Sequence, residues 1–130
     1  MSTLNASRDP LSVYLIVNGP LSMSAGKIAA QAFQACQRLL DRAEHDVQLA
    51  DTLTAWRQEG TCTITREAQT PAVFARARSE LDCVEMIDEG LTEVEPGSVT
   101  MLAVGPIRRS QEPRMLRHKR VKLLTDRTSV

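Results

Sequence analysis

The sequence has 130 residues and a formal net charge of zero at pH 7; 42% of its residues are hydrophobic and 25% are charged. These values suit one soluble globular domain, which can bury roughly two thirds of its unfolded surface. The longest early apolar run, residues 13–17, is too short to cross a bilayer, and we expect neither a membrane span nor a signal peptide. The three cysteines are widely spaced without a CxxC pair, which disfavours a disulfide scaffold or zinc site and favours the cytoplasm.

The zero net charge conceals an uneven distribution. Residues 41–95 carry thirteen Asp and Glu but only five Arg, whereas residues 103–130 carry eight Lys and Arg but only two acidic residues. The C-terminal cluster would attract a polyanion such as RNA through counterion release. A solvated basic tail has the same composition, so the charge pattern alone does not choose between the two.

The N-terminal part predicts a strand followed by a helix. Residues 12–17 (SVYLIV) form a short apolar run that ends at Asn18-Gly19-Pro20, which is typical of a buried strand and a turn. Apolar residues then recur at helical spacing over residues 24–40, and Ser22 or Ser24 can serve as the N-cap.

The middle of the chain continues the alternation of helices and strands. A second helix is predicted over residues 47–59, with Gly60 as its C-terminal stop. Residues 61–66 (TCTITR) are rich in β-branched side chains and predict a strand. Thr70-Pro71 then resembles an N-cap followed by proline at the first position of a third helix.

Two further strands complete the predicted α/β domain. They cover residues 83–87 (CVEMI) and 99–104 (VTMLAV), and the turn Pro96-Gly97 separates them. The element order predicts a mostly parallel sheet covered by helices on both faces, with this close pair of strands supplying an antiparallel member.

Lys27 is the first candidate for chemistry, because it lies near the first turn of the first predicted helix. A helix N-terminus favours anions, so a cation there suggests that a phosphate or a developing oxyanion lies beside it. An exposed surface lysine is the simpler interpretation. Gly26-Lys27 lacks the upstream glycine and the following Ser or Thr of a nucleotide-binding loop, which disfavours ATP or GTP.

Asp88, Thr92 and Thr100 form the second candidate group. Asp88 ends an apolar strand, the position from which side chains in open α/β sheets reach a ligand crevice. One carboxylate and two hydroxyls could hold a water molecule and direct it at an acyl carbon. A capping aspartate and threonines chosen for β propensity are the alternatives for the same residues.

Taken together, these motifs resemble the type II (archaeal and eukaryotic) peptidyl-tRNA hydrolases. The resemblance covers residues 13–124 and rests on LxMxxGKxAAQ, WxxxG, DxGxTxxxPGSxT and VGP. The matching positions are Leu21, Met23, Gly26, Lys27, Ala29, Ala30, Gln31, Trp56, Gly60, Asp88, Gly90, Thr92, Pro96, Gly97, Ser98, Thr100, Gly105 and Pro106.

The resemblance implies a three-layer α/β/α sandwich on a four-stranded mixed sheet, a homodimer, and hydrolysis of peptidyl-tRNA without a metal or other cofactor. We place the single domain at residues 11–124, between tails at 1–10 and 125–130. The partner is the acceptor end of tRNA, and no membrane contact is expected. The implied catalytic residues are Lys27, Asp88, Thr92 and Thr100. The implied substrate-binding residues are Gly26, Gln31, Gly97 and Ser98, and the basic cluster adds Arg117 and Arg120 as residues expected to bind RNA.

Several positions depart from the family pattern. Asn18 and Pro20 replace a common Arg and acidic residue, Ala32 and Gln34 replace the Cys and His of AAQCxHA, and Leu91 and Cys62 replace an Arg and a Lys. The catalytic set is therefore intact while the expected tRNA-binding surface has lost charge. A binding protein without esterase activity and a hydrolase of another small ester or amide remain open alternatives.

Overall fold

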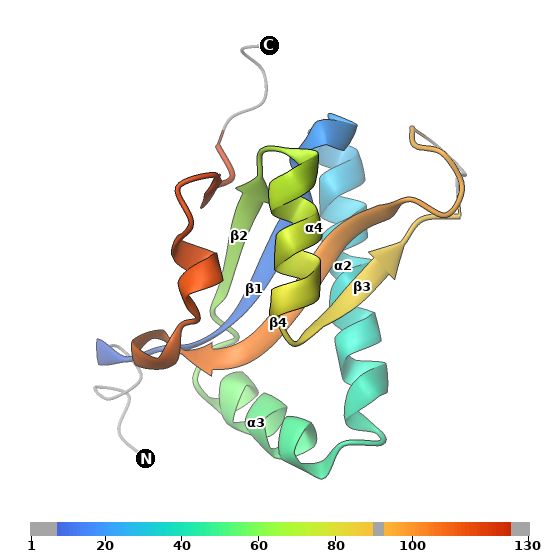
Figure 1. Cartoon of the computed structure of the whole chain (residues 1–130). Coiled ribbons are helices and arrows are strands. Elements are labelled where there is room, and N and C mark those ends of the chain that lie inside the picture. Colours follow the sequence, from blue (N-terminus) through green and yellow to red (C-terminus); the bar gives the residue numbers. More distant parts are fainter. Residues whose placement is uncertain (1–7, 90–92, 126–130) are drawn as a thin grey trace.

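The computed structural model describes residues 8–89 and 93–125, which form one open sheet with helices packed against it (Figure 1). The elements follow the chain as β1 (Leu11–Asn18), η1 (Gly19–Leu21), α2 (Ala25–Ala43), α3 (Val47–Gln58), β2 (Thr63–Ala68), α4 (Pro71–Glu80), β3 (Cys83–Ile87), β4 (Val99–Arg108), η2 (Arg109–Gln111), η3 (Arg114–Arg117) and β5 (Val121–Leu123). The predicted order of strands and long helices is confirmed.

The sheet has five strands in the order β3-β4-β1-β2-β5. The predicted count of four is wrong because β5 pairs antiparallel with Arg66–Ala68 of β2. Three residues are too few to produce a periodic signal in the sequence.

The sheet is mixed, as predicted, but it is not mostly parallel. Only β1 and β2 pair in parallel, whereas β4 is antiparallel to both of its neighbours. Strands β1, β2 and β3 run in the same direction, yet β4 returns from β3 and inserts between β3 and β1. Strand β3 therefore has no parallel neighbour, although it runs in the same direction as β1 and β2.

Local capping signals set the helix boundaries. The Ser24 side chain accepts a hydrogen bond from the Lys27 N–H at the start of α2, and Thr70 caps α4 in the same way. Helix α3 ends in a Schellman arrangement, because the Thr61 N–H donates to the Trp56 carbonyl and the Gly60 N–H donates to the Arg57 carbonyl. Gly60 has a φ of +107°, a conformation that glycine adopts readily because it has no β-carbon.

Hydrophobic clusters lie on both faces of the sheet, and Figure 1 shows α4 on the face opposite α2. Alternate residues of β1 divide between them: Val13, Leu15 and Val17 pack with α2 and α3, while Tyr14 and Ile16 pack with α4 and η3. Strand β1 is thus the central strand, buried on both sides. None of the described helices is both long enough and apolar enough to cross a membrane.

Candidate functional site

Lys27 and Asp88, 61 residues apart in the chain, form a direct ion pair. The ammonium Nζ of Lys27, in the first turn of α2, donates to Asp88 Oδ1 at 2.7 Å. Only 8% of the lysine side chain and 7% of the aspartate side chain are exposed. A lone charge at this depth would lose much of its hydration, so each residue compensates the other.

The end of β3 and a tight turn position Asp88. Met86 faces α2, and the alternation of the strand places Asp88 on the same face. The Asp88 N–H donates to the Ser98 carbonyl at 2.9 Å, and its carbonyl accepts from the Gly97 N–H at 2.7 Å. Residues 95–98 form a type II turn, in which Pro96 precedes Gly97 with its φ of +84°.

Gln31 links the ion pair to Thr100. Its Nε2 lies 3.4 Å from Asp88 Oδ1, and its Oε1 accepts a 2.5 Å hydrogen bond from the Thr100 hydroxyl. The second amide hydrogen of Gln31 is directed to Gln34 Oε1 at 3.0 Å. Gln31 is 2% exposed and Thr100 is fully buried, so this network fixes the surroundings of Asp88 from inside the protein.

A β-bulge in β4 directs Thr100 to the α2 face. The register between β3 and β4 shifts between Met86 and Ile87, which leaves Thr100 as the extra residue of β4. The next residue, Met101, also packs on the α2 face, whereas simple alternation would send the two side chains to opposite faces. The bulge therefore brings the Thr100 hydroxyl to Gln31.

Glu93, an acidic residue of the chain itself, lies at the start of α2, near the charge of Lys27. Glu93 accepts hydrogen bonds from the Ser24 N–H at 2.8 Å and from the Ser24 hydroxyl at 2.5 Å. The hydrogen bond from the Ser24 side chain, the one from its backbone N–H and the charge of Lys27 lower the pKa of Glu93. Sequence spacing gave no sign of this residue, because Glu93 lies 69 residues from Ser24.

Asp88 also borders an open depression between α2 and β3. It has a volume of about 300 Å³ and is lined by Gln34, Gln37, Arg38, Asp41, Met86, Ile87, Asp88 and Glu89. The ion pair is mostly buried, and Asp88 is its member that lines this space.

The comparisons with known proteins show the family of this chain. The model of the family described as peptidyl-tRNA hydrolase PTH2 matches residues 11–121. The chain belongs to that family. A peptidyl-tRNA hydrolase of Pyrobaculum aerophilum is 36% identical over 97 residues, which cover 71% of this chain and 81% of the relative. One of Methanopyrus kandleri is 33% identical, over 78% of this chain and 89% of the relative.

A probable peptidyl-tRNA hydrolase 2 of Schizosaccharomyces pombe is 32% identical over 82% of this chain. The chain spans only 53% of the length of that relative.

Two departures from the peptidyl-tRNA hydrolase pattern have clear structural roles. The Asn18 side chain donates to the Val99 carbonyl at 2.9 Å and so ties the end of β1 to the start of β4. Gln34 occupies the position of the family histidine and accepts the hydrogen bond of Gln31. Sequence analysis had noted Gln34 only as a loss, although its i, i+3 spacing from Gln31 could have indicated a contact.

The other predicted residues of the hydrolase site have different placements. Gly26 lies in the first turn of α2, with open space around its α-carbon, while Gly97 and Ser98 hold the backbone of Asp88. Arg117 and Arg120 lie near β5, at the opposite edge of the sheet from β3. Thr92 and the neighbouring Gly90 and Leu91 lie outside the described residues.

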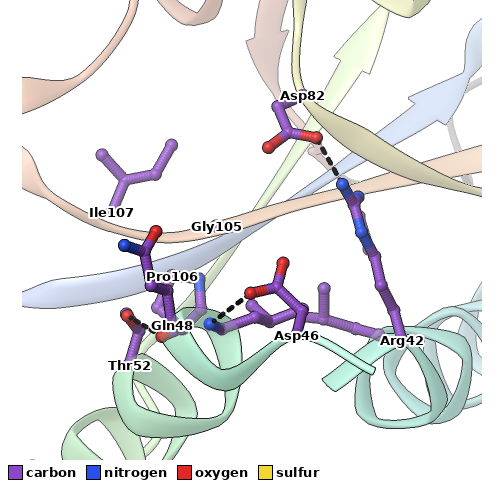
Figure 2. Close-up of a pocket in the computed structure, with 11 residues that line it drawn as sticks. Arg42, Asp46, Gln48, Thr52, Asp82, Gly105, Pro106 and Ile107 are labelled. Atoms are coloured by element: carbon purple, nitrogen blue, oxygen red, sulfur yellow. Dashed lines mark hydrogen bonds and ion pairs between the residues drawn. The ribbon is translucent and has the colours of Figure 1, made fainter. Parts of the chain in front are cut away.

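A separate depression lies between α2, α3 and the end of β4 (Figure 2). It has a volume of about 250 Å³, and neither Lys27 nor Asp88 lines it. Arg42 crosses this region to pair with Asp82 at 2.8 Å, and Asp46 accepts the Leu49 N–H as the cap of α3. Its charged groups are thus engaged in structural contacts.

Within residues 8–89 and 93–125, no group of three or more His, Cys, Asp and Glu side chains could hold a metal ion.

Proposed function

We propose that this chain hydrolyses the ester bond of peptidyl-tRNA and thereby returns free tRNA to translation. The observation that carries the proposal is the 2.7 Å ion pair of Lys27 and Asp88 in a member of this family. Asp88 also lines the α2–β3 depression, where the ester would bind.

Asp88 acts on water in the proposed reaction. The carboxylate accepts a proton from a water molecule while the water oxygen attacks the ester carbonyl carbon. The tetrahedral intermediate then loses the ribose oxygen of the tRNA, which takes the proton back from Asp88 and leaves as a hydroxyl. Lys27 stabilises the negative charge that develops on the carbonyl oxygen, or holds a phosphate near the end of the tRNA.

The remaining residues position this pair. Gln31 orients the Asp88 carboxylate, and Thr100 acts through Gln31 rather than by touching the substrate, because its hydroxyl is fully buried. We assign Gly97 and Ser98 to the main chain around the bound ester and Gly26 to close contact with the substrate. Thr92 keeps its expected place as a hydroxyl near the attacking water.

The tRNA must reach both edges of the sheet if Arg117 and Arg120 also bind it. Four strand spacings separate β3 from β5, which corresponds to about 19 Å. A nucleic acid can span this distance, so we assign these arginines to phosphates remote from the ester.

We further propose a three-layer α/β/α arrangement for the domain of residues 11–124, which the two hydrophobic clusters support. We also propose that the chain forms a homodimer. The cytoplasm is its expected location, since tRNA recycling takes place there.

A panel of substrates tests the function. The purified chain should release the peptide from an N-acetylated aminoacyl-tRNA or peptidyl-tRNA at a rate far above that for a small acyl ester of the same amino acid. Efficient cleavage of the small ester without cleavage of peptidyl-tRNA would instead support the alternative hydrolase. Tight tRNA binding without cleavage of any substrate would support a binding protein.

A further inference from the structure

We propose that the open edge of β3 binds the peptide part of the substrate as an added, parallel strand. This inference rests on the proposed function and extends it to the way in which the peptide is recognised. Strand β3 is the last strand of the sheet on its side, so nothing in the described sheet pairs with its outer edge. It also ends at Asp88, where the ester must lie.

The outward-facing main-chain groups of β3 follow from strand geometry. The N–H and C=O of Asp88 both bond to the 97–98 turn, on the β4 side. Successive residues of a strand direct these groups to opposite sides, so those of Ile87 and Glu85 face away from β4. These four groups form an edge to which an extended peptide can bind.

The other end of this edge is closed. Arg42 donates to the Cys83 carbonyl at 3.5 Å. It also pairs with Asp82 at 2.8 Å (Figure 2). The carbonyl of Cys83, the next outward-facing group after Glu85, is therefore already engaged. The available edge is thus limited to Glu85 and Ile87, and it points toward Asp88.

Charge favours a peptide over RNA on this side of the molecule. Around the edge lie four acidic residues (Asp41, Asp82, Glu85 and Glu89) and three basic residues (Arg38, Arg42 and Arg78). Arg42 and Arg78 form ion pairs with Asp82 and Glu85, so little positive charge remains for phosphates. The uncharged main chain of a peptide does not need positive charge in order to bind.

Main-chain pairing also suits a substrate whose sequence varies. A peptide that lies along β3 would form the same main-chain hydrogen bonds whatever its amino-acid sequence, because these bonds do not involve its side chains. On the α2 face, alternate side chains would reach the depression lined by Gln34, Gln37 and Arg38. That space is open and mixed in polarity, so it can accept different side chains.

The position of Asp88 fixes the direction of the peptide. Its C-terminal carbonyl, which carries the ester, must lie at the C-terminal end of β3, so the peptide runs parallel to β3. In a parallel pair, every second peptide residue directs both its N–H and its C=O at the neighbouring strand. The four main-chain groups of Glu85 and Ile87 can then bond to three alternate peptide residues within a stretch of five.

Peptide length and N-methylation test this arrangement with the unaltered enzyme. The kcat/KM for N-acetylated peptidyl-tRNAs should rise as the peptide is lengthened from one residue to about five. Each main-chain hydrogen bond should add about fivefold, and longer peptides should bring no further gain. A single N-methyl group should lower kcat/KM by about fivefold when it replaces an N–H that faces β3, and have little effect on the adjacent residue.

A matched pair of variants tests the protein side. Glu85→Pro removes the outward N–H, whereas Glu85→Ala keeps it, and both remove the ion pair with Arg78. Only the proline variant should lose the gain from longer peptides.

Three results would overturn the strand pairing: equal kcat/KM for all peptide lengths, equal effects of N-methylation at successive residues, or a change from dimer to monomer caused by Glu85→Pro but not Glu85→Ala. The last result would assign the edge to a second copy of the chain. Failure to cleave any of these substrates would instead overturn the proposed function itself.

Discussion

Lys27 and Asp88 illustrate how chemistry and stability compete at a single pair of residues. Less than a tenth of either side chain is exposed, and both charges have lost most of their contact with water. Burial of an ion pair commonly costs as much as the attraction returns, so such a pair is poor evidence for selection on stability alone. A catalytic function explains its presence better.

Removal of one partner of the ion pair should lower stability more than removal of both partners. We expect Lys27→Met to lower the free energy of unfolding by about 3–5 kcal/mol, because it leaves the Asp88 carboxylate buried without its cation. The double variant Lys27→Met/Asp88→Leu should be more stable than Lys27→Met. Urea unfolding measures the free energy of unfolding of both variants. If the loss of stability at one position simply adds to the loss at the other, this interpretation of the pair is wrong.

Tyr14 offers a second test at the scale of one side chain. Burial, the hydrogen bond to Glu112 and the charge of that carboxylate raise the pKa of Tyr14 to about 12 from its usual 10.0. The neutral phenol is thus favoured in the folded state. Its contribution to stability is complete below pH 10 and is lost as the pH rises through about 12.

The titration of Tyr14 can be observed directly because the chain has one tyrosine. The near-ultraviolet absorbance of tyrosinate should change with a midpoint near pH 12 in the folded protein. Tyr14→Phe should remove the matching loss of stability at high pH. A midpoint near pH 10 would show that the phenol is not held by Glu112.

At the scale of elements, the sequence predicted what neighbouring residues determine. The cap at Thr70 and the stop at Gly60 are local signals that were located correctly, and Ser24 was one of the two caps considered for α2. Strand β5 and the insertion of β4 beside β1 depend on contacts between distant segments, and no short window contains them. The position of Thr100 belongs to this second class, because a bulge reverses its expected face.

The candidate site divides in the same way. Lys27 and Asp88 could be selected from their places at a helix start and a strand end, and the structure brings them together. Gln34 and Glu93 were not predicted. The contact of Gln34 with Gln31 lies within α2 and could have been indicated by their spacing, whereas Glu93 meets Ser24 only through the fold, 69 residues away.

Two glycines of the predicted motifs should respond in opposite ways to alanine. At Gly105, φ is +100° and a β-carbon would lie 2.8 Å from the Ile107 nitrogen and 2.9 Å from the Ser12 carbonyl oxygen. We expect Gly105→Ala to destabilise the fold by at least about 1–3 kcal/mol. Gly26 has open space in a helix, so Gly26→Ala should stabilise it by about 0.5–1 kcal/mol.

Thermal unfolding and kcat/KM together separate structure from function at Gly26. If its main chain approaches the substrate, Gly26→Ala should raise Tm and lower kcat/KM. A fall in Tm would contradict the first expectation, and an unchanged kcat/KM would contradict the assigned contact.

At the scale of the whole molecule, the charges separate across the sheet. The basic cluster of residues 114–122 lies at the β5 edge, and the mostly acidic surroundings of Asp88 lie at the β3 edge. The two proposals together place tRNA phosphates at the β5 edge, and the ester and the peptide at the β3 edge beside Asp88.

The salt dependence of tRNA binding tests this separation. We expect the logarithm of the binding constant to fall linearly with the logarithm of salt concentration. Arg117→Glu and Arg120→Glu should each weaken binding and reduce the slope by about 1, whereas Arg57→Glu, on the exposed face of α3, should have little effect. Binding that does not depend on salt would exclude a basic RNA-binding face.

The most direct test of the account is the rate of peptidyl-tRNA cleavage by Asp88→Asn, compared with Asp51→Asn on α3. Asparagine keeps the size of the side chain but cannot accept a proton from water. We expect a loss of at least about 100-fold in kcat for Asp88→Asn and a rate near that of the wild type for Asp51→Asn. A folded Asp88→Asn variant that cleaves peptidyl-tRNA at the wild-type rate would contradict the proposed role of Asp88 as the proton acceptor.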